Sequence, residues 1–202
     1  MQQAIDAGAD IIEIWCDLIP LPELSKLIDQ KPKDIGLILN LKDSKEEGEY
    51  TGDLEDRLIV LEGFPQADYI DLPYREMYTV MPQDTSKVIL SFHDFSKTPS
   101  LTELQGLLQK MADNNPAIIK IATTVHSEKD VIHLFQLQAN NPDLMGRMII
   151  IGMSELGQAT RTTARMFKQP ITFASLDAEN ETAPGQLSAA DLRVKLEQLA
   201  LT

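Results

Sequence analysis

The sequence contains one cysteine, Cys16, so no disulfide bond can form within the chain. Residues 1–10 carry neither a basic segment nor the apolar core of a secretory signal. No apolar run approaches the length of a membrane-spanning helix. These absences predict a protein of the reducing cytoplasm that has no membrane partner.

Positive charge is also scarce. The chain has 18 lysines and arginines but 31 aspartates and glutamates, so its net charge is −13. A surface of this charge repels polyanions, so we expect no nucleic-acid partner. A small anionic substrate would need a local group of cations inside a cleft. The chain has three histidines, and His126 and His133 show no ligand-type spacing, so we expect no metal site.

The chain does contain short runs of aliphatic and β-branched residues, each typical of a buried parallel strand. Seven runs are present, at residues 10–16, 35–41, 67–74, 87–93, 117–123, 147–153 and 171–176. Segments with the apolar spacing of helices lie between most of them, at residues 21–30, 52–64, 100–114 and 127–137. This alternation predicts βα units within one domain over residues 1–202.

Repeated βα units form either an open doubly wound sheet or a closed (β/α)8 barrel, and the pattern alone leaves both open. No G-x-G-x-x-G sequence follows a predicted strand, so a dinucleotide-binding sheet has no support. A closed barrel requires one strand more than the seven runs supply. The first residues read as the middle of a helix, so we expect a segment to be missing before residue 1.

Polar residues at the outgoing ends of strands are the candidates for chemistry, because active sites of parallel α/β proteins lie there. Ser91 and His93 share a face at the end of one run, where a histidine beside aromatic residues is often only packed. Lys120 lies inside the apolar run 117–123. A buried lysine is paired, reaches solvent, or is held neutral, and a neutral amine can attack a ketone to form an imine.

Four short motifs occur in a fixed order along the chain: SFHDF, IIKIA, GM…G…TR and APGQ. Together they resemble the type I 3-dehydroquinate dehydratases, and the similarity runs from about residue 9 to the C-terminus. This resemblance implies a (β/α)8 TIM barrel, here lacking the first strand at its N-terminus, and a homodimer. It implies removal of water from 3-dehydroquinate to give 3-dehydroshikimate, without metal or cofactor.

The resemblance also implies three catalytic residues. Lys120 corresponds to the lysine that forms an imine with the substrate ketone. His93 corresponds to the general base that takes the proton beside the imine and then, as an acid, protonates the departing hydroxyl group. Glu46 corresponds to the glutamate that orients this histidine.

Five further residues are implied to bind the anionic substrate. Arg161 matches the arginine that holds its carboxylate, as a planar guanidinium can do with two parallel bonds. The other four matches are Glu13, Lys42, Thr182 and Gln186.

The chain departs from the family pattern in the same region. The pattern E-x-R-x-D reads Glu13-Ile-Trp15-Cys-Asp17, so a substrate-binding arginine is expected to be lost at Trp15. A second arginine is replaced by Lys42, which keeps the charge and loses the rigid fork. Two alternatives therefore stay open: an imine-forming lyase with an altered substrate, and an inactive barrel homologue that serves as a binding or scaffold domain.

Overall fold

The computed structural model describes residues 1–75, 80–177, 179 and 182–200, and the chain forms two compact units. The first comprises residues 1–91 with 115–117, and the second comprises residues 92–114 with 118–202. Within the described part, no helix is both long and apolar enough to cross a membrane. That residues 1–202 form one domain stays a prediction.

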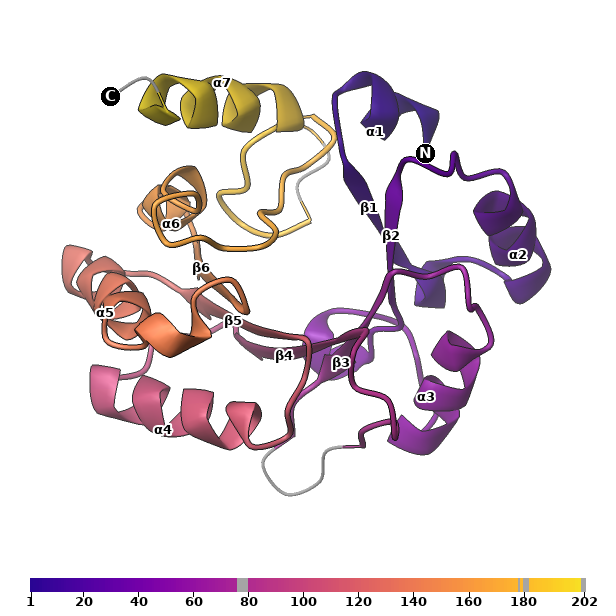
Figure 1. The fold of residues 1–202 in the computed structure, drawn as a ribbon, viewed down its shortest axis with the longest axis horizontal. Helices are drawn as coiled ribbons and strands as arrows, with labels where there is room; N and C mark the ends of the chain where they lie inside the picture. Colours follow the sequence, from indigo (N-terminus) through magenta and orange to yellow (C-terminus); the bar gives the residue numbers. More distant parts are fainter. Residues whose placement is uncertain (76–79, 178, 180–181, 201–202) are drawn as a thin grey trace. The chain divides into compact units, whose positions relative to one another are not determined.

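The first unit is built from parallel strands in chain order, joined by helices (Figure 1). β1 (Ile11–Trp15) pairs with β2 (Gly36–Asn40), β2 with β3 (Tyr69–Pro73), and β3 with the first part of β4 (Val88–Asp94). Its helices are α1 (Gln2–Asp6), α2 (Leu21–Asp29) and α3 (Leu54–Glu62), with the short 3-10 turns η1 (Cys16–Leu18) and η2 (Ser44–Glu46). α2 begins after Pro20 and buries Leu24 and Ile28, which lie one turn apart on its inner face.

The second unit contains the end of β4 and the parallel pair β5 (Ile118–Thr124) and β6 (Met148–Met153). Its helices are α4 (Leu101–Ala112), α5 (Glu128–Ala139), α6 (Gln158–Thr162) and α7 (Ala189–Ala200), with the turn η3 (Pro142–Leu144). Ser100 with Glu103 and Ser127 with Asp130 form capping boxes that start α4 and α5. The four helical segments predicted between the strands are confirmed as α2, α3, α4 and α5.

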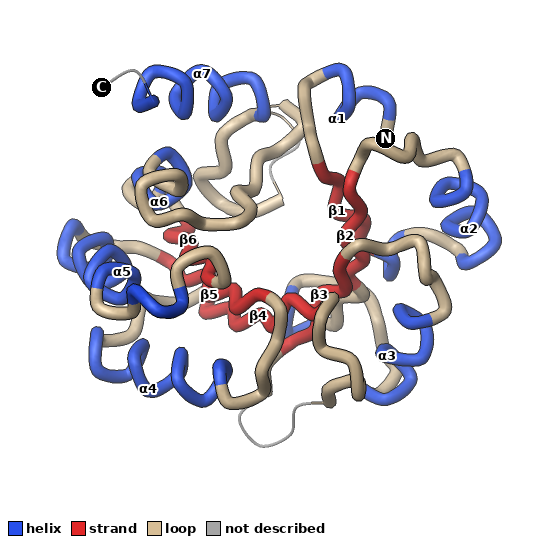
Figure 2. Tube along the Cα trace, in the orientation of Figure 1, coloured by secondary structure: helices blue, strands red, loops and turns tan. Residues whose placement is uncertain are grey.

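Six of the seven predicted strands are confirmed, and the seventh, at residues 171–176, is wrong. That segment is drawn as loop in Figure 2, and its Ser175 makes one isolated bridge to Ser188. The outward N–H groups of β6 already have partners, since Gln169 Oε1 accepts from Ile150 and Thr160 Oγ1 accepts from Gly152. A ladder on this edge is therefore replaced by side-chain hydrogen bonds, which also protect it from pairing with another chain.

Candidate active site

The predicted site residues lie within strands or in the segments that follow them, in both units. In the first unit, Glu13 lies in β1, Lys42 follows β2, and Glu46 ends η2. In the second, His93 lies near the end of β4 and Lys120 lies in β5. Arg161 lies on α6, and Thr182 and Gln186 lie in the loop before α7.

Glu13 and Lys42 are fixed by neighbours on adjacent strands of the first unit. Asn40 Nδ2 donates to Glu13 Oε1 across the paired strands at 3.0 Å. The Lys42 ammonium lies over the Trp15 ring, 3.7 Å from its centroid. The Asp17 carboxylate accepts from the backbone N–H groups of Lys42 and Glu49, both at 3.1 Å. Asp17 therefore ties the loop after β2 to the end of β1.

Glu46 belongs to a partly buried network of two carboxylates and two guanidinium groups. Arg57 from α3 contacts Glu46 at 2.7 Å and Asp43 at 3.0 Å, and its side chain is only 1% exposed. Arg75, just beyond β3, contacts Asp43 at 3.1 Å and Glu46 at 3.3 Å. Each carboxylate is thus shared by the same two arginines, which fix the loop between β2 and α3.

The environment moves the pKa values of the two carboxyl groups in opposite directions. Burial raises the pKa of Glu46 above 4.5 and outweighs the hydrogen bond and charge of Arg57. Burial would also raise the pKa of Asp43, but the charges of Arg75 and Arg57 outweigh it and hold that pKa below 3.8. Glu46 therefore depends on its arginine partners to remain ionised, because burial favours its neutral form.

Replacing Arg57 with methionine is expected to lower the free energy of unfolding by about 3 kcal/mol, measured by urea denaturation. The change leaves two carboxylates without their shortest ion pairs in a buried place. The loss is expected at the lower end of the range for broken buried pairs, because Arg75 still contacts both groups. Arg165→Met, at an exposed position, is the control. Equal stability of the two variants would contradict this role of Arg57.

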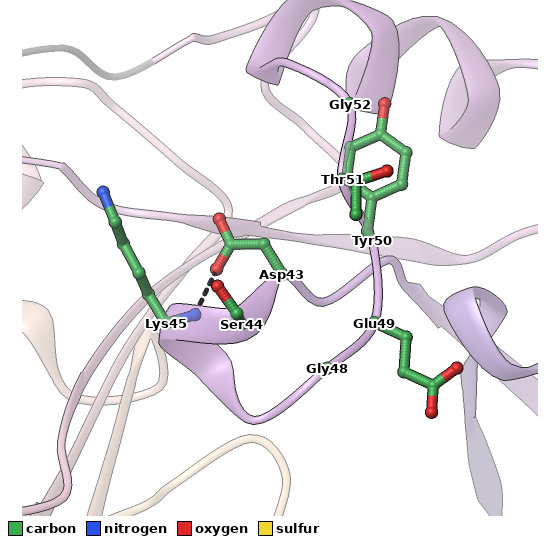
Figure 3. A pocket seen from close by; sticks show the side chains of 8 residues that line it. All are labelled: Asp43, Ser44, Lys45, Gly48, Glu49, Tyr50, Thr51 and Gly52. Carbon is green, nitrogen blue, oxygen red and sulfur yellow. Dashed lines mark hydrogen bonds between the residues drawn. The ribbon is translucent and has the colours of Figure 1, made fainter.

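An open depression lies along the same loop (Figure 3). It is lined by Asp43, Ser44, Lys45, Gly48, Glu49, Tyr50, Thr51 and Gly52. The Asp43 carboxylate accepts a hydrogen bond from the Lys45 N–H group at its edge. None of the eight predicted site residues is part of this lining, so the depression is not the predicted catalytic centre.

In the second unit, hydrogen bonds join the outgoing ends of β4 and β5. Thr124 Oγ1 donates to the Asp94 carbonyl oxygen at 3.2 Å, and Thr98 Oγ1 donates to the Thr124 carbonyl oxygen at 2.9 Å. Asp94 directly follows His93, and Thr124 lies four residues beyond Lys120, on the same face of the strand. The two predicted catalytic residues therefore lie on strands whose outgoing ends are bonded to each other.

Aromatic rings contact both of these residues. The His93 ring stacks on Phe95, with centroids 5.7 Å apart and planes 8° from parallel. The Lys120 ammonium lies 4.6 Å from the centroid of the Phe173 ring, and Lys120 is 5% exposed. The ring face is electron-rich, so it favours a cation at this position.

Arg161 is buried on α6 and donates to the Gly152 carbonyl oxygen at 2.8 Å. Close packing of β6 against the start of α6 makes this bond possible, since a side chain on Gly152 or Gly157 would collide with the backbone of the other. The guanidinium group has five N–H donors, and this bond uses one of them.

Thr182 and Gln186 are brought into direct contact by the turn between them. Gln186 Oε1 accepts from both the N–H and the hydroxyl group of Thr182, each at 2.9 Å. Gly185 has a φ of +71°, and an added Cβ would collide with the Ser154 backbone. The APGQ motif is therefore a tight turn packed on the end of β6.

The sequence reasoning missed Arg57, Arg75 and Phe173. Arg57 could have been found, because it lies four residues before the buried Leu61 on the inner face of a predicted helix. Phe173 lies in the run wrongly predicted as a strand, and no local signal pairs it with Lys120. In the described ranges, no group of three or more histidine, cysteine, aspartate or glutamate side chains is placed to hold a metal ion.

Residues 1–201 match the family model for type I 3-dehydroquinase. The chain is 30% identical to the 3-dehydroquinate dehydratase of Desulfotalea psychrophila, covering 96% of this chain and 91% of that protein. It is 33% identical to the 3-dehydroquinate dehydratase of Methanothermobacter thermautotrophicus, and this match covers 98% of this chain and 88% of that protein.

Solved structures agree with the sequence relatives. The type I 3-dehydroquinate dehydratase of Clostridium difficile is similar with a TM-score of 0.80 at 24% identity, covering 98% of this chain and 84% of that one. The 3-dehydroquinate dehydratase of Aquifex aeolicus is similar with a TM-score of 0.78 at 23% sequence identity. The match covers 98% of this chain and 91% of that one. These similarities confirm the predicted fold class, an α/β protein of the (β/α)8 TIM-barrel type.

Proposed function

Because this chain belongs to the type I 3-dehydroquinase family, we propose that it converts 3-dehydroquinate to 3-dehydroshikimate through an imine on Lys120, with His93 as the general acid and base. The observation that carries the proposal is the placement of Lys120 in the second unit. It is a buried lysine in an apolar strand, and its strand end is bonded to the one that bears His93.

In the first step, the neutral Lys120 amine attacks the ketone carbon and one proton is taken up from solvent. The carbonyl oxygen leaves as water and a protonated imine forms, and the proton is returned when the imine is hydrolysed. This cation withdraws electrons from the neighbouring carbon. The Phe173 ring beside Lys120 Nζ supports the step, because a ring face attracts the protonated imine as it attracts an ammonium ion.

In the second step, His93 removes the proton from that neighbouring carbon. The electron pair of the C–H bond forms a C=C bond to the former ketone carbon, and the π pair of the C=N bond moves onto nitrogen to give a neutral enamine. The enamine expels the hydroxyl group on the next carbon, which leaves as water after accepting the proton from His93. Hydrolysis of the imine then releases 3-dehydroshikimate and restores the Lys120 amine. No net proton is gained or lost over the cycle.

The remaining predicted residues are proposed to bind and orient the substrate. Arg161 would hold the carboxylate, and its bond to Gly152 supports a fixed position for the guanidinium group. Thr182 and Gln186 would cover the substrate from the APGQ turn, while Glu13 and Lys42 would contact its oxygen atoms. The family resemblance also gives Glu46 the role of orienting the catalytic histidine, and Arg57 and Arg75 favour its ionised form.

A single domain over residues 1–202, a homodimer and a cytoplasmic location are further parts of the proposal. The family resemblance supports the dimer, and the single cysteine supports a reducing compartment. The net charge of −13 supports a small substrate over nucleic acid as the partner.

Borohydride trapping tests the central claim. Incubation with 3-dehydroquinate and borohydride is expected to reduce the imine to a stable adduct on Lys120, located by peptide mass spectrometry. An adduct that forms only with another ketone would instead support a lyase with an altered substrate. The absence of both adduct and turnover would support the inactive scaffold.

A further inference from the structure

Trp15 and Lys42 stand at the two positions where the chain lacks an expected arginine, and they contact each other. The Lys42 ammonium lies 3.7 Å from the centroid of the Trp15 ring. Lys42 is 7% exposed, so the contact is largely shielded from water. The attraction between a cation and an aromatic face is strongest for tryptophan and increases on desolvation. The indole ring therefore holds the charge of Lys42 in one place.

The backbone of Lys42 is already fixed by other groups. Its N–H donates to Asp17 at 3.1 Å, and its carbonyl oxygen accepts from the Tyr50 N–H at 2.9 Å. A Cβ added to Gly48 would collide with the Lys42 backbone, so the loop packs directly on this residue. The main chain is thus fixed on both sides of a flexible four-carbon side chain. Trp15 contacts that side chain at its charged end.

We propose that Trp15 is a positioning residue, whose ring holds the Lys42 ammonium so that it binds an oxygen group of the substrate. The inference rests on the proposed function, because it takes Lys42 as a substrate contact. In this region, the ammonium group of Lys42, held by the Trp15 ring, replaces the two arginines of the family pattern as the group that binds substrate oxygen. On this proposal, Trp15 does more than replace a substrate-binding arginine. The affinity for substrate that Lys42 contributes depends on the Trp15 ring.

A single exchange, Trp15→Arg, separates the two interpretations. If Trp15 is only a lost contact, arginine at this position restores a donor and lowers KM. If Trp15 positions Lys42, arginine removes the aromatic face and places a second cation against the ammonium, which raises KM. Like charges at this distance repel. A lower KM in Trp15→Arg would overturn the inference.

Steady-state kinetics of further variants measure the coupling. Trp15→Leu is expected to raise KM roughly 5- to 30-fold with little change in kcat, and Trp15→Phe, which keeps a weaker aromatic face, is expected to raise it less. In a Lys42→Met background, Trp15→Leu is expected to have almost no further effect on KM. An equal effect of Trp15→Leu in both backgrounds would mean that the ring acts on packing alone, and would overturn the inference.

Fluorescence gives a readout that does not depend on turnover, because Trp15 is the single tryptophan of the chain. Lys42→Met is expected to change the emission of Trp15, since it removes the charge from the ring face. Lys26→Met, which removes an exposed charge from α2 in the same unit, is expected to leave it unchanged. Identical spectra for wild type and Lys42→Met would contradict the contact.

Failure of the inference can be told from failure of the proposed function. If wild-type protein neither turns over 3-dehydroquinate nor forms the Lys120 adduct, the proposed function fails. If the wild type does both, and the Trp15 variants retain its KM, only the positioning role of Trp15 fails. Thermal unfolding of every variant identifies any that do not fold, and the emission spectra of Lys42→Met still test the contact in that case.

Discussion

Lys120→Arg is expected to yield no borohydride adduct and to lower kcat by a factor on the order of 10⁴ or more. Arginine keeps a cation near the Phe173 ring, but its guanidinium group does not lose its proton in proteins and cannot form the imine. The exchange therefore removes the nucleophile while it preserves the charge. Single-turnover kinetics and mass spectrometry measure the two effects separately.

The control for this change is Lys129→Met, which removes an exposed lysine from the first turn of α5 in the same unit. It is expected to retain wild-type turnover and the adduct on Lys120. Substantial activity in Lys120→Arg would mean that Lys120 acts only through its positive charge. The imine mechanism would then be wrong, although the family membership would stand.

The sequence was sufficient to predict most of the fold because the signals for the confirmed elements are local. The run around Ile150 is almost continuously apolar, and the run at residues 117–122 is apolar apart from Lys120, as is typical of strands covered on both faces. Ser100 with Glu103 and Ser127 with Asp130 mark helix starts by contacts three residues apart. Such patterns are readable without knowledge of the partners.

The run at residues 171–176 has the same local pattern and forms no strand, because strand formation also requires an available neighbour. The outward edge of β6 is occupied by Gln169, Thr160 and the Pro184 carbonyl group. These partners lie outside the run, so composition within it could not exclude a strand. The APGQ turn, by contrast, was predictable, because Gly185 adopts the positive φ that glycine favours.

The residues of the candidate site also differ in how far the local sequence predicts them. Motifs and their order predict Lys120, His93 and Arg161 as site residues, and all three lie in regular elements. The groups that surround them come from distant parts of the chain, as Arg75 does for Glu46, 29 residues away. The contact between Trp15 and Lys42 also joins the end of β1 to the segment after β2. Each residue alone is only a departure from the family pattern.

His93→Ala is expected to lower the rate of the chemical step by a factor on the order of 10² to 10⁴ while imine formation continues. Lys120 is intact in this variant, so the borohydride adduct should still form, and it should carry the unreacted substrate skeleton because proton removal is blocked. Added imidazole is expected to restore part of the turnover if the space left by the ring admits it. The measurement is the mass of the trapped adduct together with single-turnover rates.

The matched control is His126→Ala, in the same unit, where an exposed histidine bonds the Ser96 carbonyl group. Removal of the His126 ring is expected to leave the rate of the chemical step unchanged, because this ring bonds the loop after β4. Comparing the two variants is informative because each histidine has a contact that is sufficient for a purely structural role. His93 stacks on Phe95, and His126 bonds the Ser96 carbonyl group. If His93→Ala kept wild-type turnover, the stacking on Phe95 would be the whole role of His93, and another group would have to move the proton.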